Sequence, residues 1–123
     1  MTLNRNQLLD LAEQYSTPLY VYDGDKILDR YRGLYNFIPY PKLKIHFAMK
    51  ANYNFEILKM LYAAGASLDT VSPAEVLLAM KAGFTKDRII YTANNMTKSD
   101  VEAVHDLGVL MNIGELTRLE KYG

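Results

Sequence analysis

Cysteine is absent from the 123 residues, and histidine occurs only at His46 and His105. Without cysteine the chain forms no disulfides and offers no thiolate to a metal ion. The two histidines do not have the spacing of a zinc site. These absences exclude a disulfide-stapled scaffold, and we expect no metal in the functional site.

An excess of charge of either sign is also absent. Fourteen Lys and Arg residues balance fourteen Asp and Glu residues, so the formal net charge is zero. A balanced chain lacks the basic surface that attracts nucleic acids or anionic membranes. The N-terminal run "MTLNRNQLLDLAEQY" has neither a long apolar stretch nor a small-residue cleavage signature. We therefore expect a cytoplasmic protein with a small-molecule partner, and neither nucleic acid nor a membrane as partner.

The sequence does contain a regular alternation of strand-like and helix-like runs. The strand-like runs "LKIHFAMKA", "ASLDTVS", "RIIYTAN" and "VLMNIGE" begin at residues 43, 66, 88 and 109, so successive starts are 23, 22 and 21 residues apart. Gly65, Gly83 and Gly108 fall where helices between these runs would end in a left-handed residue. Short strands alternating with single helices predict an α/β fold with parallel strands. Four such units fit part of an eight-unit barrel or an open doubly wound sheet.

The first 41 residues follow another pattern. Five apolar side chains share one face of a predicted helix: Leu8, Leu9, Leu11, Ala12 and Tyr15. Pro18 ends that helix, and the run "PLYVYD" alternates at period two, as a strand does. Asp23 or Asp25 then caps a second helix.

Pro39 and Pro41 mark the end of this segment. We expect residues 1–41 to form an N-terminal helix–strand–helix segment. Residues 42–123 would then hold βα units 1 to 4.

The first strand-like run ends on a lysine, in the stretch "HFAMKAN". Alternation along a strand places Lys50 on the same face as Ala48 and His46, and Met49 and Phe47 on the face toward the helices. In a barrel Lys50 would point inward at the carboxyl mouth, where barrel enzymes carry their chemistry. Two interpretations stay open: a lysine that extends into water, or an amine among apolar walls that forms a Schiff base with an aldehyde. His46, two steps deeper, is predicted to be a packed, hydrogen-bonded core histidine.

Taken together, "TPLYVYD", "HFAMKAN", "SLDTVSPAEV" and "RIIYTANN" resemble the N-terminal part of the fold type III decarboxylases that depend on pyridoxal 5'-phosphate. The resemblance extends from about Thr17 to the end of the chain, and within the family it is strongest to the diaminopimelate decarboxylases. It implies that residues 42–123 are the first half of a cofactor-binding (β/α)8 TIM barrel of the alanine racemase-like fold. It also implies that the strand in residues 1–41 belongs with a β-rich second domain.

The same resemblance implies an activity. Lys50 would carry pyridoxal phosphate through a Schiff base, and the substrate would be an amino acid that loses its α-carboxylate as CO2. For the diaminopimelate decarboxylases this means meso-2,6-diaminopimelate as substrate and L-lysine as product, in lysine biosynthesis. A homodimer with a shared active site is implied as well. Because the motifs that the family places later are absent, we expect the 123-residue chain alone to be inactive.

Two acidic residues acquire cofactor-binding roles from the resemblance. Asp69, on the second strand-like run, would sit beside the cofactor and its lysine, where a negative charge favours the protonated Schiff base. The alternative for Asp69 is to accept backbone hydrogen bonds at a strand end. Glu75 matches a position where the family keeps an acid near the cofactor. However, the stretch from Ser72 to Glu75 also has the form of a capping box, which would account for both residues.

Other interpretations stay open. Alanine racemases and the small pyridoxal-phosphate homeostasis proteins also hold a lysine at the end of the first barrel strand, although a racemase normally continues into Tyr-Gly-His-Gly where this chain has "ANYNF". Decarboxylases of ornithine, arginine or carboxynorspermidine share nearly all of the motifs present. A non-catalytic barrel fragment is the alternative from a different class.

Overall fold

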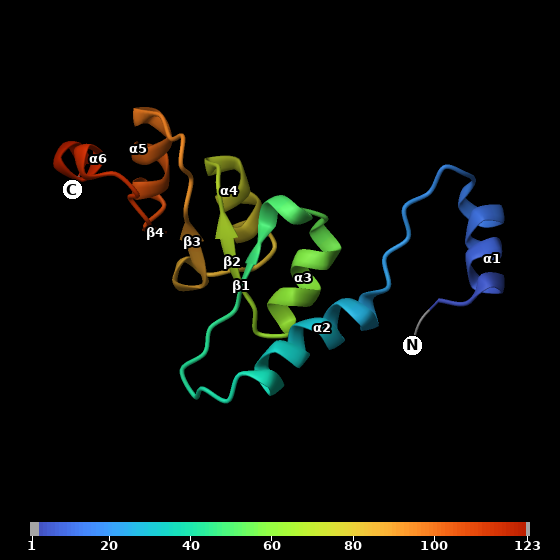
Figure 1. The fold of residues 1–123 in the computed structure, drawn as a ribbon. Coiled ribbons are helices and arrows are strands. Elements are labelled where there is room, and N and C mark those ends of the chain that lie inside the picture. The colour runs from blue at the N-terminus through green and yellow to red at the C-terminus, as the bar shows by residue number, and fades with distance from the viewer. Residues whose placement is uncertain (1–2, 123) are drawn as a thin grey trace. The chain divides into compact units, whose positions relative to one another are not determined.

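The computed structural model describes residues 3–122 of the chain, shown as a ribbon in Figure 1. The chain divides into two compact units between Leu43 and Lys44. Each unit has its own secondary structure and is described by itself.

The first unit contains two helices, α1 (Arg5–Tyr15) and α2 (Gly24–Phe37). The side chain of Asn4 caps α1 by accepting a hydrogen bond from the backbone N–H of Gln7 at 3.0 Å. Asp23 caps α2, because its Oδ1 accepts from the backbone N–H of Lys26 at 3.0 Å. Both predicted helices are confirmed, and Asp23 rather than Asp25 supplies the cap.

The predicted strand over "PLYVYD" is not formed. The backbone between α1 and α2 has no strand assignment, and the apolar side chains from Leu19 to Tyr22 are exposed. A strand is stable only where its N–H and C=O groups pair with a neighbouring strand. None of the described residues pairs with this segment, so its period-two pattern has no sheet to join.

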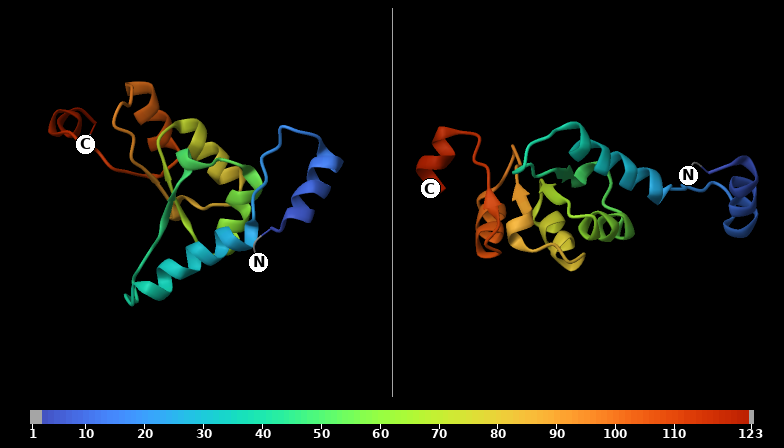
Figure 2. Two further views of the ribbon diagram at one scale, coloured as in Figure 1. Left: turned by 45° about the vertical axis from the view of Figure 1, so that its right-hand side comes forward. Right: turned by 90° about the horizontal axis from the view of Figure 1, so that it is seen from below.

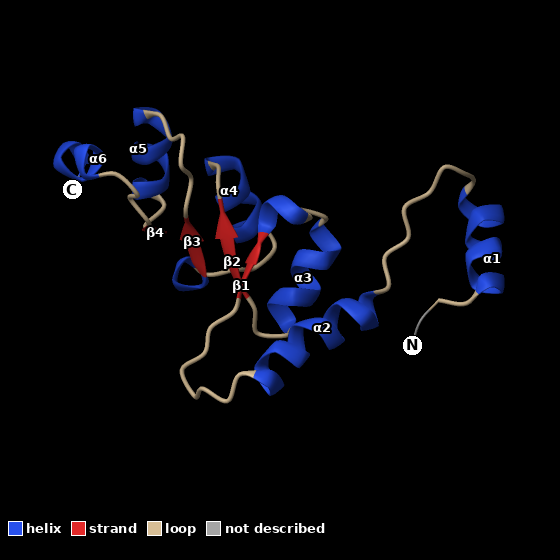
Figure 3. Cartoon of the chain, viewed as in Figure 1, coloured by secondary structure: helices blue, strands red, loops and turns tan. Residues whose placement is uncertain are grey.

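The second unit is a four-stranded parallel sheet in the order β1-β2-β3-β4. The strands, red in Figure 3, are β1 (His46–Ala48), β2 (Ser67–Thr70), β3 (Ile89–Tyr91) and β4 (Leu110–Met111). The α-helices that follow them are α3 (Phe55–Ala63), α4 (Pro73–Lys81), α5 (Lys98–Asp106) and α6 (Leu116–Tyr122). Two short 3-10 helices complete the unit, η1 (Met49–Ala51) after β1 and η2 (Lys86–Arg88) before β3. The four predicted βα units are confirmed.

The helices α3, α4 and α5 cover one face of the sheet (Figures 1 and 2). Their apolar side chains join those of the strands in one buried core, whose members include Leu58, Leu68, Val76, Ile89, Tyr91 and Val104. The other face carries the alternate residues of each strand. Ala48, Asp69 and Ile90 lie in register across it and are half-buried, and Leu110 is 68% exposed. The sheet therefore has a covered face and an open face.

Glycine ends the first three of these helices as the sequence predicts. Gly65, Gly83 and Gly108 have φ angles of 94°, 106° and 69°. At Gly83 a Cβ would also lie 3.5 Å from the ring of Tyr62. Each glycine provides the left-handed residue that turns the chain from a helix toward the next strand.

Among residues 3–122 no helix combines the length and the apolar character needed to cross a membrane.

Arg88 joins α3 to the start of β3. Its guanidinium lies over the rings of Tyr62, 4.5 Å from the centroid, and Phe84, 5.2 Å from the centroid. Its Nε and Nη2 atoms donate to the carbonyl of Ala66, and Nη2 also donates to that of Tyr62 at 3.0 Å. A planar guanidinium can make all of these contacts at once, whereas an ammonium group cannot.

We expect Arg88→Ala to lower the free energy of unfolding by about 2 kcal/mol, because charge-assisted hydrogen bonds and ring contacts are lost together. Urea denaturation followed by circular dichroism would measure the change. Lys59→Ala is the matched control. Lys59 also lies over a ring, 5.5 Å from the centroid of Phe55, but it is exposed, and within residues 3–122 its ion pair is with Glu56. The Lys59→Ala variant should lower the free energy of unfolding by less than about 0.5 kcal/mol. Equal losses of unfolding free energy in the two variants would contradict the stabilising role of the Arg88 contacts with Tyr62, Phe84 and Ala66.

Candidate functional site

The carboxyl ends of β1, β2 and β3 lie at the same edge of the sheet because the strands are parallel. Each strand is followed by a short loop and then by a helix with a side-chain cap at its start. The caps are Asn54 for α3, Ser72 for α4 and Thr97 for α5. The residues at this edge are therefore held between a strand and a fixed helix start.

Lys50 lies at this edge, in η1. The strand ends at Ala48, and the chain turns so that Met49 is fully buried while Lys50 is exposed. The turn is closed by the backbone N–H of Asn52, which donates to the carbonyl of Met49 at 3.1 Å. The strand thus ends two residues before Lys50, and none of residues 3–122 encloses the lysine in apolar walls. Its Schiff-base role stays a prediction. Lys50 makes no hydrogen bond or ion pair with any residue in 3–122.

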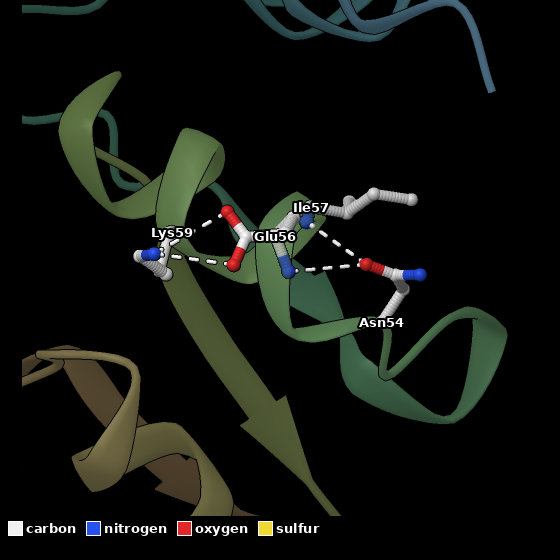
Figure 4. A network of polar contacts seen from close by, with 4 residues as sticks. All are labelled: Asn54, Glu56, Ile57 and Lys59. Carbon is white, nitrogen blue, oxygen red and sulfur yellow. Dashed lines mark hydrogen bonds and ion pairs between the residues drawn. The ribbon is translucent and has the colours of Figure 1, made fainter.

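The segment after Lys50 is fixed by asparagines. The Oδ1 atom of Asn52 accepts from the backbone N–H of Asn54 at 2.9 Å. Asn54 in turn caps α3, accepting from the N–H groups of Glu56 at 3.0 Å and Ile57 at 3.4 Å (Figure 4). Figure 4 also shows Lys59 paired with Glu56, at 3.2 Å. Lys59 on α3 therefore forms an ion pair, whereas Lys50 forms none with residues 3–122.

Asp69 lies on β2, beside the strand that leads to Lys50. The register pairs it with Ala48 on β1 and Ile90 on β3, and η1 packs against β2. Its Oδ1 atom accepts a hydrogen bond from the hydroxyl of Thr92 at 2.5 Å. Within residues 3–122 no backbone N–H donates to this carboxylate, so the predicted alternative of a strand-end acceptor does not describe it. Oδ2 of Asp69 has no partner in the same part of the chain.

Glu75 acts at the start of α4. Its Oε2 atom accepts from the backbone N–H of Val71 at 2.7 Å, and its own N–H donates to the hydroxyl of Ser72 at 3.2 Å. The expected capping interaction is present in a shifted form, because the carboxylate reaches one residue further back than in a capping box.

Burial raises the pKa of Tyr91, and the negative charges of Asp100 and Glu75 raise it further.

His46 differs from its prediction. It is exposed rather than packed in the core, and its Nδ1 atom lies 3.3 Å from the carbonyl oxygen of Leu68. The hydrogen bond that was expected is present, provided that Nδ1 carries the proton. The burial was wrong because His46 belongs to the open face, which no described element covers.

Thr92 is the site residue that sequence reasoning missed. It follows β3 by one residue and lies on the same face as Ile90, so strand alternation was a signal for it. The structure thus brings Asp69 and Thr92 into direct contact, with Lys50 on the adjoining element. No hydrogen bond or ion pair joins Lys50, Asp69 and Glu75 to one another in residues 3–122.

A family model described as "pyridoxal-dependent decarboxylase, pyridoxal binding domain" matches residues 25–122. The match covers most of the chain, and the chain belongs to this family. The predicted fold type III family, the half-barrel fold class and the cofactor, pyridoxal phosphate, are thereby confirmed.

Among the curated relatives is the diaminopimelate decarboxylase of Methanothermobacter thermautotrophicus. It is 38% identical over 113 residues, which are 90% of this chain and 26% of the relative. The diaminopimelate decarboxylase of Aquifex aeolicus is 36% identical over 104 residues, 85% of this chain and 24% of the relative. This chain therefore spans about a quarter of the length of these relatives.

Solved structures give the same fold. Diaminopimelate decarboxylase from Helicobacter pylori, complexed with L-lysine, matches with a TM-score of 0.86 and 29% identity, covering 94% of this chain and 29% of that one. Lysine/ornithine decarboxylase from Vibrio vulnificus, complexed with putrescine, matches with a TM-score of 0.88 and 28% identity, covering 98% and 34%.

We expect Ser72→Ala to lower the free energy of unfolding by about 1 kcal/mol through loss of the α4 cap. Glu75→Gln should cost less than half of that, because the amide keeps an oxygen for the N–H of Val71. Urea denaturation would compare the two, with Glu102→Gln on the exposed face of α5 as the control for loss of a helix carboxylate. A larger loss for Glu75→Gln than for Ser72→Ala would show that the charge of Glu75, and not its capping bond, matters most.

Proposed function

We propose that the complete protein is an amino-acid decarboxylase and that this chain supplies the lysine that holds its cofactor. The observation that carries the proposal is an exposed, unpartnered amine at the carboxyl edge of the sheet, next to the strand that bears Asp69. Such an amine fits an aldehyde, and a neighbouring carboxylate fits the positive charge that results. The donor set of this chain is therefore suited to pyridoxal phosphate.

Lys50 is the covalent anchor in this proposal. Its Nζ would hold the cofactor covalently through the cofactor aldehyde and would be released as a free amine when the substrate binds. When bound, the cofactor supplies an electron sink for the pair left behind as the α-carboxylate departs as CO2.

Asp69 would stabilise positive charge beside Lys50. Its Oδ2 atom has no partner among the residues described, so one carboxylate oxygen is available for that task. Glu75 is proposed as a further cofactor contact through Oε1, since Oε2 is already taken by Val71.

The proposed substrate is meso-2,6-diaminopimelate, with L-lysine and CO2 as products. It is supported by the identity of 38% and 36% to two diaminopimelate decarboxylases. A second candidate is a decarboxylase of ornithine or a related amino acid, which the likeness to the Vibrio vulnificus structure favours. The shared active site of a homodimer, the cytoplasmic location and the inactivity of the 123-residue chain by itself stay predictions.

We expect borohydride reduction of the complete protein with its cofactor, followed by peptide mass mapping, to place the pyridoxyl group on Lys50. Lys59 is engaged by Glu56 and serves as the internal control. Lys50→Ala should lose the adduct and nearly all turnover while keeping the circular dichroism of the parent, because an exposed side chain contributes little packing. An adduct on Lys44, Lys59 or Lys81 would overturn the assignment of the anchor.

The substrate proposal predicts that the complete protein releases CO2 from meso-diaminopimelate at least about tenfold faster than from ornithine or arginine, a difference of about 1.4 kcal/mol in the barrier. Labelled CO2 release at equal substrate concentrations would compare the three, with Lys50→Ala as the blank. A preference for ornithine or arginine would keep the cofactor role and reject the named substrate.

A further inference from the structure

Two threonine hydroxyls link β2 and β3 from opposite faces of the sheet. Thr70, fully buried on the covered face, donates to the carbonyl of Ile90 at 3.0 Å. Thr92, half-buried on the open face, donates to Oδ1 of Asp69 at 2.5 Å. The first bond ties side chain to backbone within the core, whereas the second joins two side chains beside the candidate site.

The bond from Thr92 is not needed to pair the strands. The backbone N–H of Thr92 already donates to the carbonyl of Thr70 at 2.9 Å and so extends the ladder between β2 and β3. The hydroxyl adds a charge-assisted bond of the short kind that an ionised carboxylate accepts. This bond restricts the torsion of the Asp69 carboxylate, whose side chain is only half-buried.

We propose that Thr92 is a positioning residue that holds Oδ1 of Asp69 and leaves Oδ2 for the positive charge at the bond between Lys50 and the cofactor. The inference rests on the proposed function. Thr92 acts through Asp69, so its removal leaves the anchor and the strand pairing in place. What changes is how well the carboxylate stabilises the protonated form of that bond.

The sign of the effect follows from the charges. A fixed carboxylate favours the protonated, positively charged form, so it raises the pH at which the proton is lost. A carboxylate that turns toward solvent favours the protonated form less, so the pH at which half of the proton is lost falls. The elements packed against β2 are β1, η1, β3 and α4, and their titratable groups are His46, Lys50, Tyr91, Glu75 and Lys81. None of these is altered in the variants below.

The test compares Thr92→Val, Thr92→Ser and Thr70→Val in the complete protein reconstituted with pyridoxal phosphate. The readout is the pH midpoint of the visible absorbance of the cofactor bound to Lys50. We expect Thr92→Val to lower this midpoint by about one pH unit and to lower kcat more than it raises KM. Thr92→Ser keeps the hydroxyl and should restore both values. Thr70→Val should lower the urea midpoint of unfolding and leave the absorbance midpoint of the folded protein unchanged.

The possible outcomes distinguish failure of the positioning role of Thr92 from failure of the proposed function. An unchanged absorbance midpoint in Thr92→Val, with the cofactor still on Lys50, overturns the positioning role and leaves the proposed function intact. A shift in Thr70→Val as large as that in Thr92→Val also overturns it, since any loss of a hydroxyl between β2 and β3 would then suffice. If the unaltered protein shows no absorbance from a cofactor on Lys50, the proposed function and the inference both fall.

Discussion

Parallel pairing of β1, β2 and β3 is the constraint on which the site depends. Because the three strands run in one direction, their carboxyl ends lie at one edge, where Asp69 contacts Thr92 although 23 residues separate them, and Lys50 lies on the adjoining element. Parallel pairing also requires a helix between successive strands to return the chain to the opposite edge of the sheet. The helices α3, α4 and α5 do this on the covered face. A one-residue slip of β2 would turn Asp69 into the core and Leu68 toward the open face.

The elements that the sequence predicts well are those set by local or periodic physics. The near-constant interval between strand-like runs is the length of one βα unit, and Gly65 and Gly83 mark the left-handed turn that such a unit needs. Asp23 caps its helix by accepting a hydrogen bond from the backbone N–H of Lys26, which is only three residues away in the sequence. The resemblance to the family, which the family model confirms, depends on the combination of "HFAMKAN", "SLDTVSPAEV" and "RIIYTANN" from three successive units.

What could not be predicted depends on neighbours that are distant in sequence. The "PLYVYD" segment has the pattern of a strand, but a strand exists only with a partner, and none of the described residues provides one. Its pairing with the β-rich second domain that the resemblance implies stays a prediction. His46 was placed on the correct face and given the wrong burial, since alternation defines a face but not what covers it. The partnership of Thr92 with Asp69 required the register of β2 against β3, which no single run contains.

The two faces of the sheet divide stability from chemistry. On the covered face even a polar side chain such as Thr70 must have its hydrogen bond, because an unsatisfied buried hydroxyl is costly. On the open face, none of residues 3–122 covers Asp69 or Lys50 completely, and the residues of the candidate site lie on this face or at its edge. Thr92 stands between the two roles, with its backbone in the ladder and its hydroxyl on the carboxylate.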